Sequence, residues 1–279
     1  MLAENGYGKS GIRLVKVARR GDHHDFRDVT VAVRLEGDFE RAHVGGDNSA
    51  VLPTDTMKNT VYALAKDHFD RDIESFGLFL TEHFVRNNPP VARARVEVSE
   101  RPWERLTVGG RPHPHAFSRP GGERRTTCVT RTRQGALVLS GLEDLVLAKS
   151  GRSGFAGFAR DGFTTLKETE DRILATAVKA SWLYTGAPND FDGSFEGIRR
   201  TLLETFAGHD SASVQHTLYA MGEAVLKDHA EVAEVRLSLP NRHHILVDLS
   251  PFGLENNNEV FVATEEPFGL IEGTVRRRS

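Results

Sequence analysis

Val51-Leu52-Pro53-Thr54-Asp55-Thr56-Met57-Lys58-Asn59-Thr60 joins an apolar run to a helix-forming segment. We expect a strand to end at Pro53 and a helix to continue from Met57, with Thr54 or Thr56 as the N-cap, because a threonine hydroxyl can accept an orphan backbone N–H. Such a junction gathers hydroxyl, carboxylate and N–H groups where small anions often bind. Taken alone, the pattern is more typical of an ordinary helix start.

The segments around this stretch predict antiparallel strands and a pair of helices. Residues 12–17 and 29–35 alternate apolar and polar side chains, as half-buried strands do. Two helical patterns follow, at residues 54–69 and 73–84, and Asn87-Asn88-Pro89-Pro90 ends the second. Next come a strand in which Ala92, Ala94, Val96 and Val98 alternate with charged residues, and a strand pair across Gly109-Gly110.

The second half of the chain repeats this order. Strand patterns at residues 126–132 and 136–147 precede a glycine-rich loop at residues 151–162 and an extended stretch towards Tyr184. Helical patterns follow at residues 195–206 and 211–229, the second with Val214, Leu218, Met221 and Val225 on one side, and strands return at residues 232–239, 244–249 and 259–263. The pattern predicts an α+β chain with helices on one face of an antiparallel sheet. Assembly would cover its exposed edges.

The composition limits the classes of function that the chain can have. The 279 residues are 39% hydrophobic and 27% charged with a net charge of −3, which is ordinary for a globular protein and argues against a general nucleic-acid surface. We interpret the arginine runs at residues 93–105, 119–133 and 276–278 as solvated faces or subunit contacts. The arginine-rich strand offers only Trp103 for stacking bases.

Cysteine usage and the chain ends predict a cytoplasmic protein. The single cysteine, Cys128, excludes an intrachain disulfide and a multi-thiolate metal site, and its strand-like surroundings predict a packed thiol. We find no membrane-spanning run, no signal-peptide pattern at the N-terminus, and an Arg276-Arg277-Arg278-Ser279 tail unlike the Ser-Lys-Leu peroxisomal address.

Several separate motifs occur in the order that they have in urate oxidases (uricases). They are Tyr7-Gly8-Lys9, the stretch at residues 51–60, Ser211-Ala212-Ser213-Val214-Gln215, Leu239-Pro240-Asn241-Arg242-His243, Asn258-Glu259-Val260-Phe261 and Gly269-Leu270-Ile271. The resemblance covers residues 7–275 and implies two tandem tunnelling-fold (T-fold) units, at residues 1–134 and 135–279. It also implies that two subunits close a β-barrel tunnel, and that two barrels stack into a homotetramer.

The resemblance places a urate-binding set in the second half of the chain. Phe155 would stack on the purine, and Arg172 would donate hydrogen bonds to a carbonyl oxygen and the adjacent anionic nitrogen. The Gln215 amide would form hydrogen bonds with the opposite edge of the purine. The backbone N–H of Val214 would donate beside Gln215. Without the motifs, a phenylalanine near glycines is usually core and an arginine after two acids is usually a surface ion pair.

A proton relay is implied by Lys9, Thr54 and His243. A lysine removed from water and bonded to a threonine hydroxyl can lose its charge near neutral pH, and imidazole can carry the proton onward. Asn241, with Thr54, resembles the pair that holds water or dioxygen above the purine. Asp55 resembles a further contact through its N–H, since its carboxylate would repel an anion.

The implied reaction is cofactor-independent. Urate would reduce dioxygen directly, and water would then add to give 5-hydroxyisourate and hydrogen peroxide, in urate breakdown towards allantoin. In the family, Thr54 and Asp55 come from the subunit opposite to that supplying Arg172 and Gln215, so the active sites lie at subunit interfaces.

The sequence departs from the family pattern at Glu170, where many relatives have an aromatic residue, at Ala156, where a large aromatic is common, and at Arg242, which replaces a lysine. These changes concern affinity and loop packing rather than the type of reaction.

Two other functions compete with this interpretation. The histidine pairs His23-His24, His113-Pro114-His115 and His243-His244 leave open a metal-dependent hydrolase or cyclohydrolase, although the chain has no His-Glu-x-x-His helix. A purine-binding T-fold module without turnover is the non-enzymatic alternative.

Overall fold

The structure is a computed structural model that describes residues 2–277. Met1, Arg278 and Ser279 lie outside the described residues. The predictions about a signal peptide and a peroxisomal address rest in part on these three residues. The predicted α+β fold with antiparallel sheet is confirmed. The chain forms two compact units, Met1–Leu142 with Leu183–Phe195, and Glu143–Trp182 with Glu196–Ser279. Within residues 2–277, no helix is long and apolar enough to cross a membrane.

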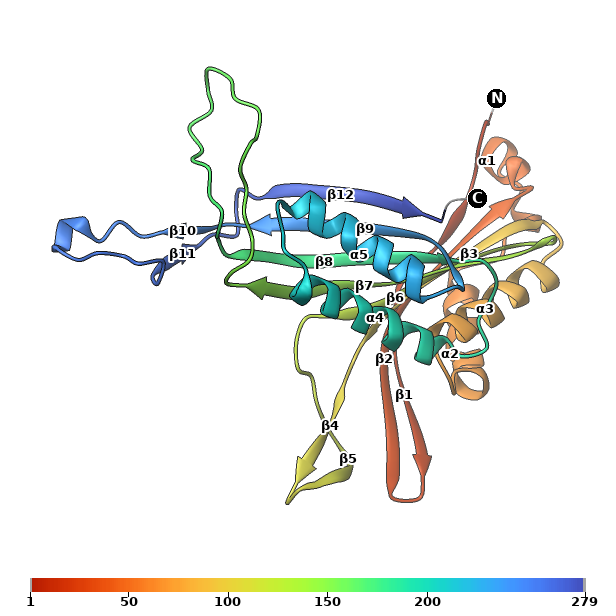
Figure 1. The fold of residues 1–279 in the computed structure, drawn as a ribbon. Helices are drawn as coiled ribbons and strands as arrows, with labels where there is room; N and C mark the ends of the chain where they lie inside the picture. The colour runs from red at the N-terminus through yellow and green to blue at the C-terminus, as the bar shows by residue number, and fades with distance from the viewer. Residues whose placement is uncertain (1, 278–279) are drawn as a thin grey trace. The chain divides into compact units, whose positions relative to one another are not determined.

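The first unit is built on four long antiparallel strands in the order β1-β2-β3-β6 (Figure 1). They are β1 (Tyr7–Arg20), β2 (His23–Gly37), β3 (Val91–Arg101) and β6 (Arg124–Thr132). Val33 pairs with Val96, and Val96 pairs with Val129, so apolar side chains form a row across the sheet. All three are buried, and this row is part of the core.

Helices α2 (Thr54–His68) and α3 (Ile73–Asn87) cover this sheet. α2 contacts β1, and α3 contacts β3 and β6. At Gly77 of α3 an added Cβ would lie 2.8 Å from Cγ2 of Val129, so the glycine allows the helix to approach the sheet. The side chain of Asp72 caps α3 by accepting from Ser75 N at 2.6 Å. As predicted, α3 ends before the two prolines.

The predicted start of α2 is wrong in two respects. No strand precedes the helix, because the short α1 (Glu40–Gly45) and the 3-10 helix η1 (Asn48–Ala50) occupy that place. The N-cap is Pro53, with Met57 N bonded to Pro53 O at 3.1 Å, and neither Thr54 nor Thr56 makes a side-chain cap. Thr54 is already inside the helix, so its hydroxyl is free for other uses.

Two predictions about single side chains in the first unit are also wrong. Ala92 is exposed, because a register shift between Glu36 and Gly37 makes it an extra residue opposite β2. Cys128 is half-buried rather than packed, since Thr127 and Val129 take the core-facing positions and its Sγ lies 3.2 Å from Arg95 Nε.

A buried polar network lies within the first unit. Glu74 of α3 is fully buried and accepts hydrogen bonds from Arg125 Nη2 and Ser140 Oγ, each at 2.7 Å. Arg125 also pairs with Asp192, and its guanidinium lies 4.5 Å from the ring centre of Phe195. Arg125 is 9% exposed, so this part of the arginine run is not a solvated face as predicted. Burial raises the pKa of Glu74, although the charge of Arg125 opposes the shift.

The second unit contains the strand order β7-β8-β9-β12, and the unit boundary passes through the first two of these strands. They are β7 (Gly135–Lys149), β8 (Leu174–Tyr184), β9 (Val232–Arg242) and β12 (Gly269–Arg276). α4 (Phe191–Gly208) and α5 (Val214–Asp228) follow β8, and α5 packs on β9 and β12. The four residues predicted on one side of α5 are all buried. β12 was not predicted from the sequence.

Smaller elements complete the chain (Figure 1). β4 (Glu104–Val108) and β5 (Arg111–Ser118) form the hairpin predicted across Gly109-Gly110, while β10 (His244–Leu246) and β11 (Phe261–Ala263) form a short pair joined through the 3-10 helix η2 (Ser250–Phe252). The loop between β7 and β8 is irregular, as predicted, and carries two of the predicted site residues.

Candidate functional site

The predicted site residues fall into two sets, one on each unit. Lys9, Thr54 and Asp55 belong to the first unit. The second unit carries the other members, which are Phe155, Arg172, Val214, Gln215, Asn241 and His243. We refer to them below as the first set and the second set.

Lys9 of the first set lies on β1 opposite Val33 of β2. The neighbouring residue has to be glycine, since a Cβ on Gly8 would lie 1.9 Å from the carbonyl oxygen of Val33. Tyr7 connects the start of β1 to the segment before α2, because its hydroxyl accepts a hydrogen bond from Leu52 N at 2.8 Å. These contacts hold Lys9 close to the beginning of α2.

Thr54 and Asp55 are the first two residues of α2. The first N–H groups of a helix have no intrahelical acceptor, so they are available to a ligand. The carboxylate of Asp55 accepts from Lys58 and, at 3.1 Å, from Asn59 Nδ2. The hydrogen bond from Lys58 lowers the pKa of Asp55, and the charge of Lys9 contributes in the same direction. The Asp55 carboxylate is thus already hydrogen-bonded to one ammonium group and one amide of its own helix.

Phe155 and Arg172 of the second set are brought together by the loop between β7 and β8. Phe155 N donates to Thr169 O at 2.7 Å, and Thr169 N donates back to Phe155 O at 3.1 Å. Arg172 N donates to Ser153 O at 2.8 Å. The Arg172 guanidinium carbon consequently lies 5.1 Å from the centre of the Phe155 ring.

The Arg172 guanidinium is an unpaired cation. Among residues 2–277 it forms no ion pair, and its Nε is buried without a hydrogen-bond partner. Burial lowers the pKa of Arg172 from its usual value, yet arginine remains charged at any physiological pH. An unpaired, half-buried guanidinium beside an aromatic ring is suited to a planar anion.

Val214 and Gln215 begin α5, and Ser213 is its N-cap. The hydroxyl of Ser213 accepts from His216 N at 3.1 Å, which leaves the N–H of Val214 without an intrahelical acceptor. The Val214 side chain is buried in the core, whereas the Gln215 side chain is exposed. The same turn therefore offers a backbone donor and a side-chain amide.

Asn241 and His243 lie two residues apart at the end of β9. Asn241 is 8% exposed and pairs with Gly269 of β12, whose missing side chain leaves space beside it. His243 is exposed, and its carbonyl oxygen accepts from Thr264 N at 2.9 Å. Its imidazole is free to meet a partner from outside the unit.

A cavity of about 420 Å³ adjoins Phe155 within the second unit. The lining residues are Arg152, Gly154, Phe155, Ala156, Thr169, Glu170, Asp210, Ser211 and Ala212. Ala156 and Glu170, two of the positions that depart from the family pattern, are among them. Both residues therefore form part of the wall of a cavity that Phe155 also lines.

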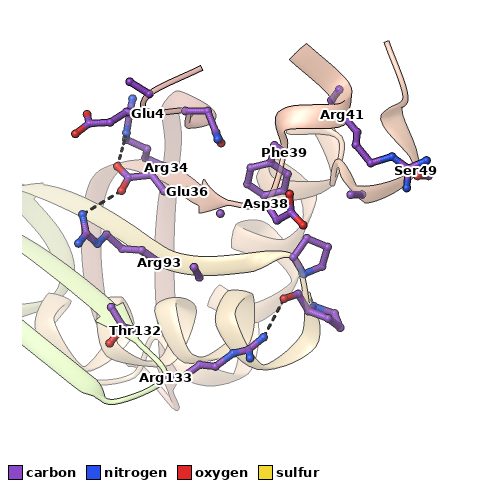
Figure 2. A pocket seen from close by; sticks show the side chains of 18 of the residues that line it. Glu4, Arg34, Glu36, Asp38, Phe39, Arg41, Ser49, Arg93, Thr132 and Arg133 are labelled. Carbon is purple, nitrogen blue, oxygen red and sulfur yellow. Dashed lines mark hydrogen bonds and ion pairs between the residues drawn. The ribbon is translucent and has the colours of Figure 1, made fainter. Parts of the chain in front are cut away.

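A second cavity, of about 1040 Å³, lies in the first unit and contains none of the predicted site residues (Figure 2). Four arginines line it, and each is already engaged. Arg41 pairs with Asp47 at 2.7 Å. Arg34 and Arg93 both bind Glu36, and Arg133 donates to Pro89 O at 2.9 Å. The cavity therefore lacks a free cation of the kind that Arg172 provides.

Three histidines of the predicted pairs lie close together. His115 lies between His24 and His113, with ring centres 5.7 Å and 4.7 Å away. Nowhere in residues 2–277 do three His, Cys, Asp or Glu side chains group so that they could hold a metal ion. The three rings pack against one another, with His24 on β2 and His113 and His115 on β5.

Comparison with known proteins identifies the family. The uricase family model matches residues 5–130 and 138–272. A uricase from Arthrobacter globiformis is 46% identical over 277 residues, which cover 99% of this chain and 90% of that protein. A uricase from Dictyostelium discoideum is 38% identical over 279 residues, with 99% and 97% coverage. The chain belongs to the uricase family. Uricases are urate oxidases, and the chain is accordingly an oxidoreductase.

Solved structures agree with the uricase assignment. The crystal structure of the Arthrobacter globiformis uricase superposes with a TM-score of 0.95, covering 99% of this chain and 95% of that one. A uricase from Bacillus fastidious, at 24% identity, superposes with a TM-score of 0.83 over 98% of this chain and 93% of that one. At that identity the likeness concerns the fold alone. The T-fold architecture expected of the uricase family is thereby confirmed.

The sequence does not indicate the residues that hold each set in place within its own unit. Tyr7 and Ser211 were quoted only as parts of motifs, but each makes hydrogen bonds that fix a site segment. Ser153 was not singled out, although it is 1% exposed and pairs with Ser211. For Tyr7 and Ser211, the available signal was their place inside motifs shared with uricases; no such signal exists for Ser153.

Proposed function

We propose that this protein is a cofactor-independent urate oxidase that converts urate, dioxygen and water to 5-hydroxyisourate and hydrogen peroxide. The observation that carries this proposal is Arg172, an unpaired guanidinium 5.1 Å from the ring of Phe155. A purine stacked on Phe155 would place its anionic edge within reach of this fork. Val214 N–H and the Gln215 amide, at the first turn of α5, would then read the opposite edge.

Proton transfer is assigned to Lys9, Thr54 and His243. The Thr54 hydroxyl is free of any capping role, and Lys9 lies close enough to the start of α2 to influence Asp55. Lys9 would draw a proton from urate through the Thr54 hydroxyl, and His243 would pass it on. The resulting electron-rich urate is oxidised by dioxygen, which takes two electrons and two protons to become peroxide, and water adds to the purine.

Asn241 and Thr54 would hold dioxygen or water above the purine plane. Asn241 is nearly buried beside Gly269, so its amide is restrained by the strand pair. Asp55 would contribute its N–H, because its carboxylate is occupied by Lys58 and Asn59. In this mechanism protein groups supply positioning and electrostatics, and urate itself supplies the electrons.

We further propose a homotetramer in which the first set of one subunit meets the second set of another. Two subunits would close a β-barrel and two barrels would stack, which removes the exposed sheet edges. The tandem units at residues 1–134 and 135–279 would be the repeating T-fold units of this barrel. The proposed partners are urate and dioxygen, without nucleic acid or membrane, and the proposed location is the cytoplasm.

The test follows the ultraviolet absorbance of urate in aerobic buffer with purified, chelator-treated protein, coupled to peroxide detection. Loss of the urate band with stoichiometric peroxide supports the proposal. Binding of urate without its loss would instead favour the purine-binding module, and a protein that neither binds nor consumes urate would refute both. A requirement for added metal would refute the cofactor-independent mechanism.

A further inference from the structure

Ser211 joins the loop of Phe155 to the start of α5 through its backbone. Ser211 N donates to Arg152 O at 3.0 Å, and Gly154 N donates to Ser211 O at 2.8 Å. These two bonds make an isolated parallel bridge between Ser153 and Ser211. The residue just before Phe155 is therefore tied to a residue three positions before Val214.

The same bridge also fixes Arg172. Ser153, the partner of Ser211, accepts the hydrogen bond of Arg172 N at 2.8 Å. Ser153 is 1% exposed and Ser211 is 4% exposed, so water does not compete for these backbone groups. The Ser153–Ser211 bridge thus connects the backbone next to Phe155, the backbone of Arg172 and the segment before Val214.

A buried hydroxyl chain holds Ser211 against α5. Thr217 Oγ1 donates to Ser211 Oγ at 2.8 Å, and Ser211 Oγ donates to Ser213 O at 3.0 Å. Thr217 is fully buried, and its own N–H donates to Ser213 O at 3.1 Å. Ser211 Oγ and Thr217 N thus both donate to the carbonyl oxygen of Ser213. Ser213 is the N-cap of α5 and directly precedes Val214.

We propose that Ser211 and Thr217 are positioning residues for urate. Their hydroxyl pair fixes the spacing between Phe155 and Arg172 on one side and Val214 and Gln215 on the other. This inference rests on the proposed function of the second set and assigns neither residue a contact with substrate. Small errors in spacing are costly, because both edges of a rigid purine have to be met at once.

The test compares Thr217→Val with Thr217→Ser, measuring kcat and KM for urate at a temperature well below unfolding. The valine keeps the shape and removes the hydroxyl, so we expect KM to rise about 10-fold, whereas the serine keeps the donor and stays within about 3-fold of wild type. Ser211→Ala should have the larger effect, because it leaves the Thr217 hydroxyl buried without an acceptor. The double variant should lose less than the sum of the two.

The matched control is Thr81→Val. Thr81 is another fully buried helical threonine, bonded to Gly77 O at 2.9 Å, in a helix that carries no site residue. Its loss should lower the unfolding temperature without moving KM. Hydrogen exchange gives a second measurement, with faster exchange expected at residues 151–158 in Thr217→Val and not in Thr81→Val.

The outcomes separate this inference from the proposed function. If the wild-type protein oxidises urate while folded Thr217→Val and Ser211→Ala keep the wild-type KM, the positioning role is wrong and the function stands. If Thr81→Val raises KM as much as Thr217→Val does, general destabilisation explains the effect and the inference is wrong. If the wild-type protein does not oxidise urate, both the positioning role and the proposed function are wrong.

Discussion

At the scale of single residues, the resemblance to urate oxidases assigns ligand contacts to side chains in both units, and this assignment stays a prediction. Gln215 and Asn241 lie in the motifs that carry the resemblance, and Phe155 and Arg172 would supply the ring and the cation that a planar anionic purine requires. Residues that act through a buried side-chain hydrogen bond could not be predicted. Thr217 is such a residue, because nothing in a helical pattern shows that its hydroxyl turns towards Ser211.

Arg172→Lys tests the geometry of the guanidinium. Lysine keeps the charge but loses the planar fork, so kcat/KM for urate should fall by about 100-fold. The control is Arg160→Lys in the same loop, where the guanidinium lies 5.0 Å from the Phe158 ring and pairs with Glu168. We expect the control to keep nearly all activity. An equally active Arg172→Lys enzyme would show that charge alone suffices.

His209 predicts a pH dependence of stability. Burial lowers its pKa, assisted by the charges of His216 and Lys149, and its Nε2 is buried without a hydrogen-bond partner. Between the folded and unfolded pKa the unfolded chain binds the extra proton, so stability is complete above the unfolded value and is lost as pH falls. As the pH is lowered from about 7.5 to about 5.5, the unfolding temperature of His209→Gln should therefore fall less than that of the wild-type protein. Measurement at pH 8, where both imidazole and amide are neutral, is the reference, and identical pH profiles would contradict the prediction.

At the scale of helices and strands, periodicity located the long elements and failed where register changed. The apolar positions of α5 and the strand pattern of β3 follow from the periods of helix and strand. Ala92 fits the strand period, but the bulge opposite Gly37 moves it out of the core. β12 alternates too, although glycines at Gly269 and Gly273 weaken its pattern. Bulges and glycine-rich strands depend on a partner strand that the local sequence does not specify.

Two buried threonines with different surroundings give opposite predictions. Thr176 of β8 is fully buried and its hydroxyl has no partner, whereas the Thr81 hydroxyl donates to Gly77 O. Thr176→Val should raise the free energy of unfolding by about 1 kcal/mol, and Thr81→Val should lower it by about 1 kcal/mol. Denaturant titration of the two isosteric variants measures both. Destabilisation by Thr176→Val would show that its hydroxyl is satisfied in solution.

At the scale of the whole molecule, the compact units draw on segments that are not continuous in sequence. Leu183–Phe195 belongs with Met1–Leu142, and the physical reason is the buried network in which Arg125 meets Asp192 and Phe195. Composition alone suggested solvated arginines in that region. The repeat boundary predicted between residues 134 and 135 concerns the order of elements and stays a prediction.

The proposed division of each site between subunits predicts complementation. Thr54→Ala and Arg172→Ala should each be inactive, but refolding them together should restore roughly a quarter of wild-type activity, because that share of sites combines two unmutated sets. The control mixes the two variants after folding, when subunits have not exchanged. Failure to regain activity in co-assembled, soluble protein would place both sets of a site on one subunit.

Cys128 gives the chain a convenient handle for observing such assembly. It is the only thiol among the 279 residues, and it lies half-buried on the strand face turned away from the core-facing Val129. A maleimide dye would therefore attach at one defined position without removal of other cysteines. If subunits close over this face, labelling would be slow in the native protein and fast after dissociation, so the rate of dye attachment would report the state of the assembly directly.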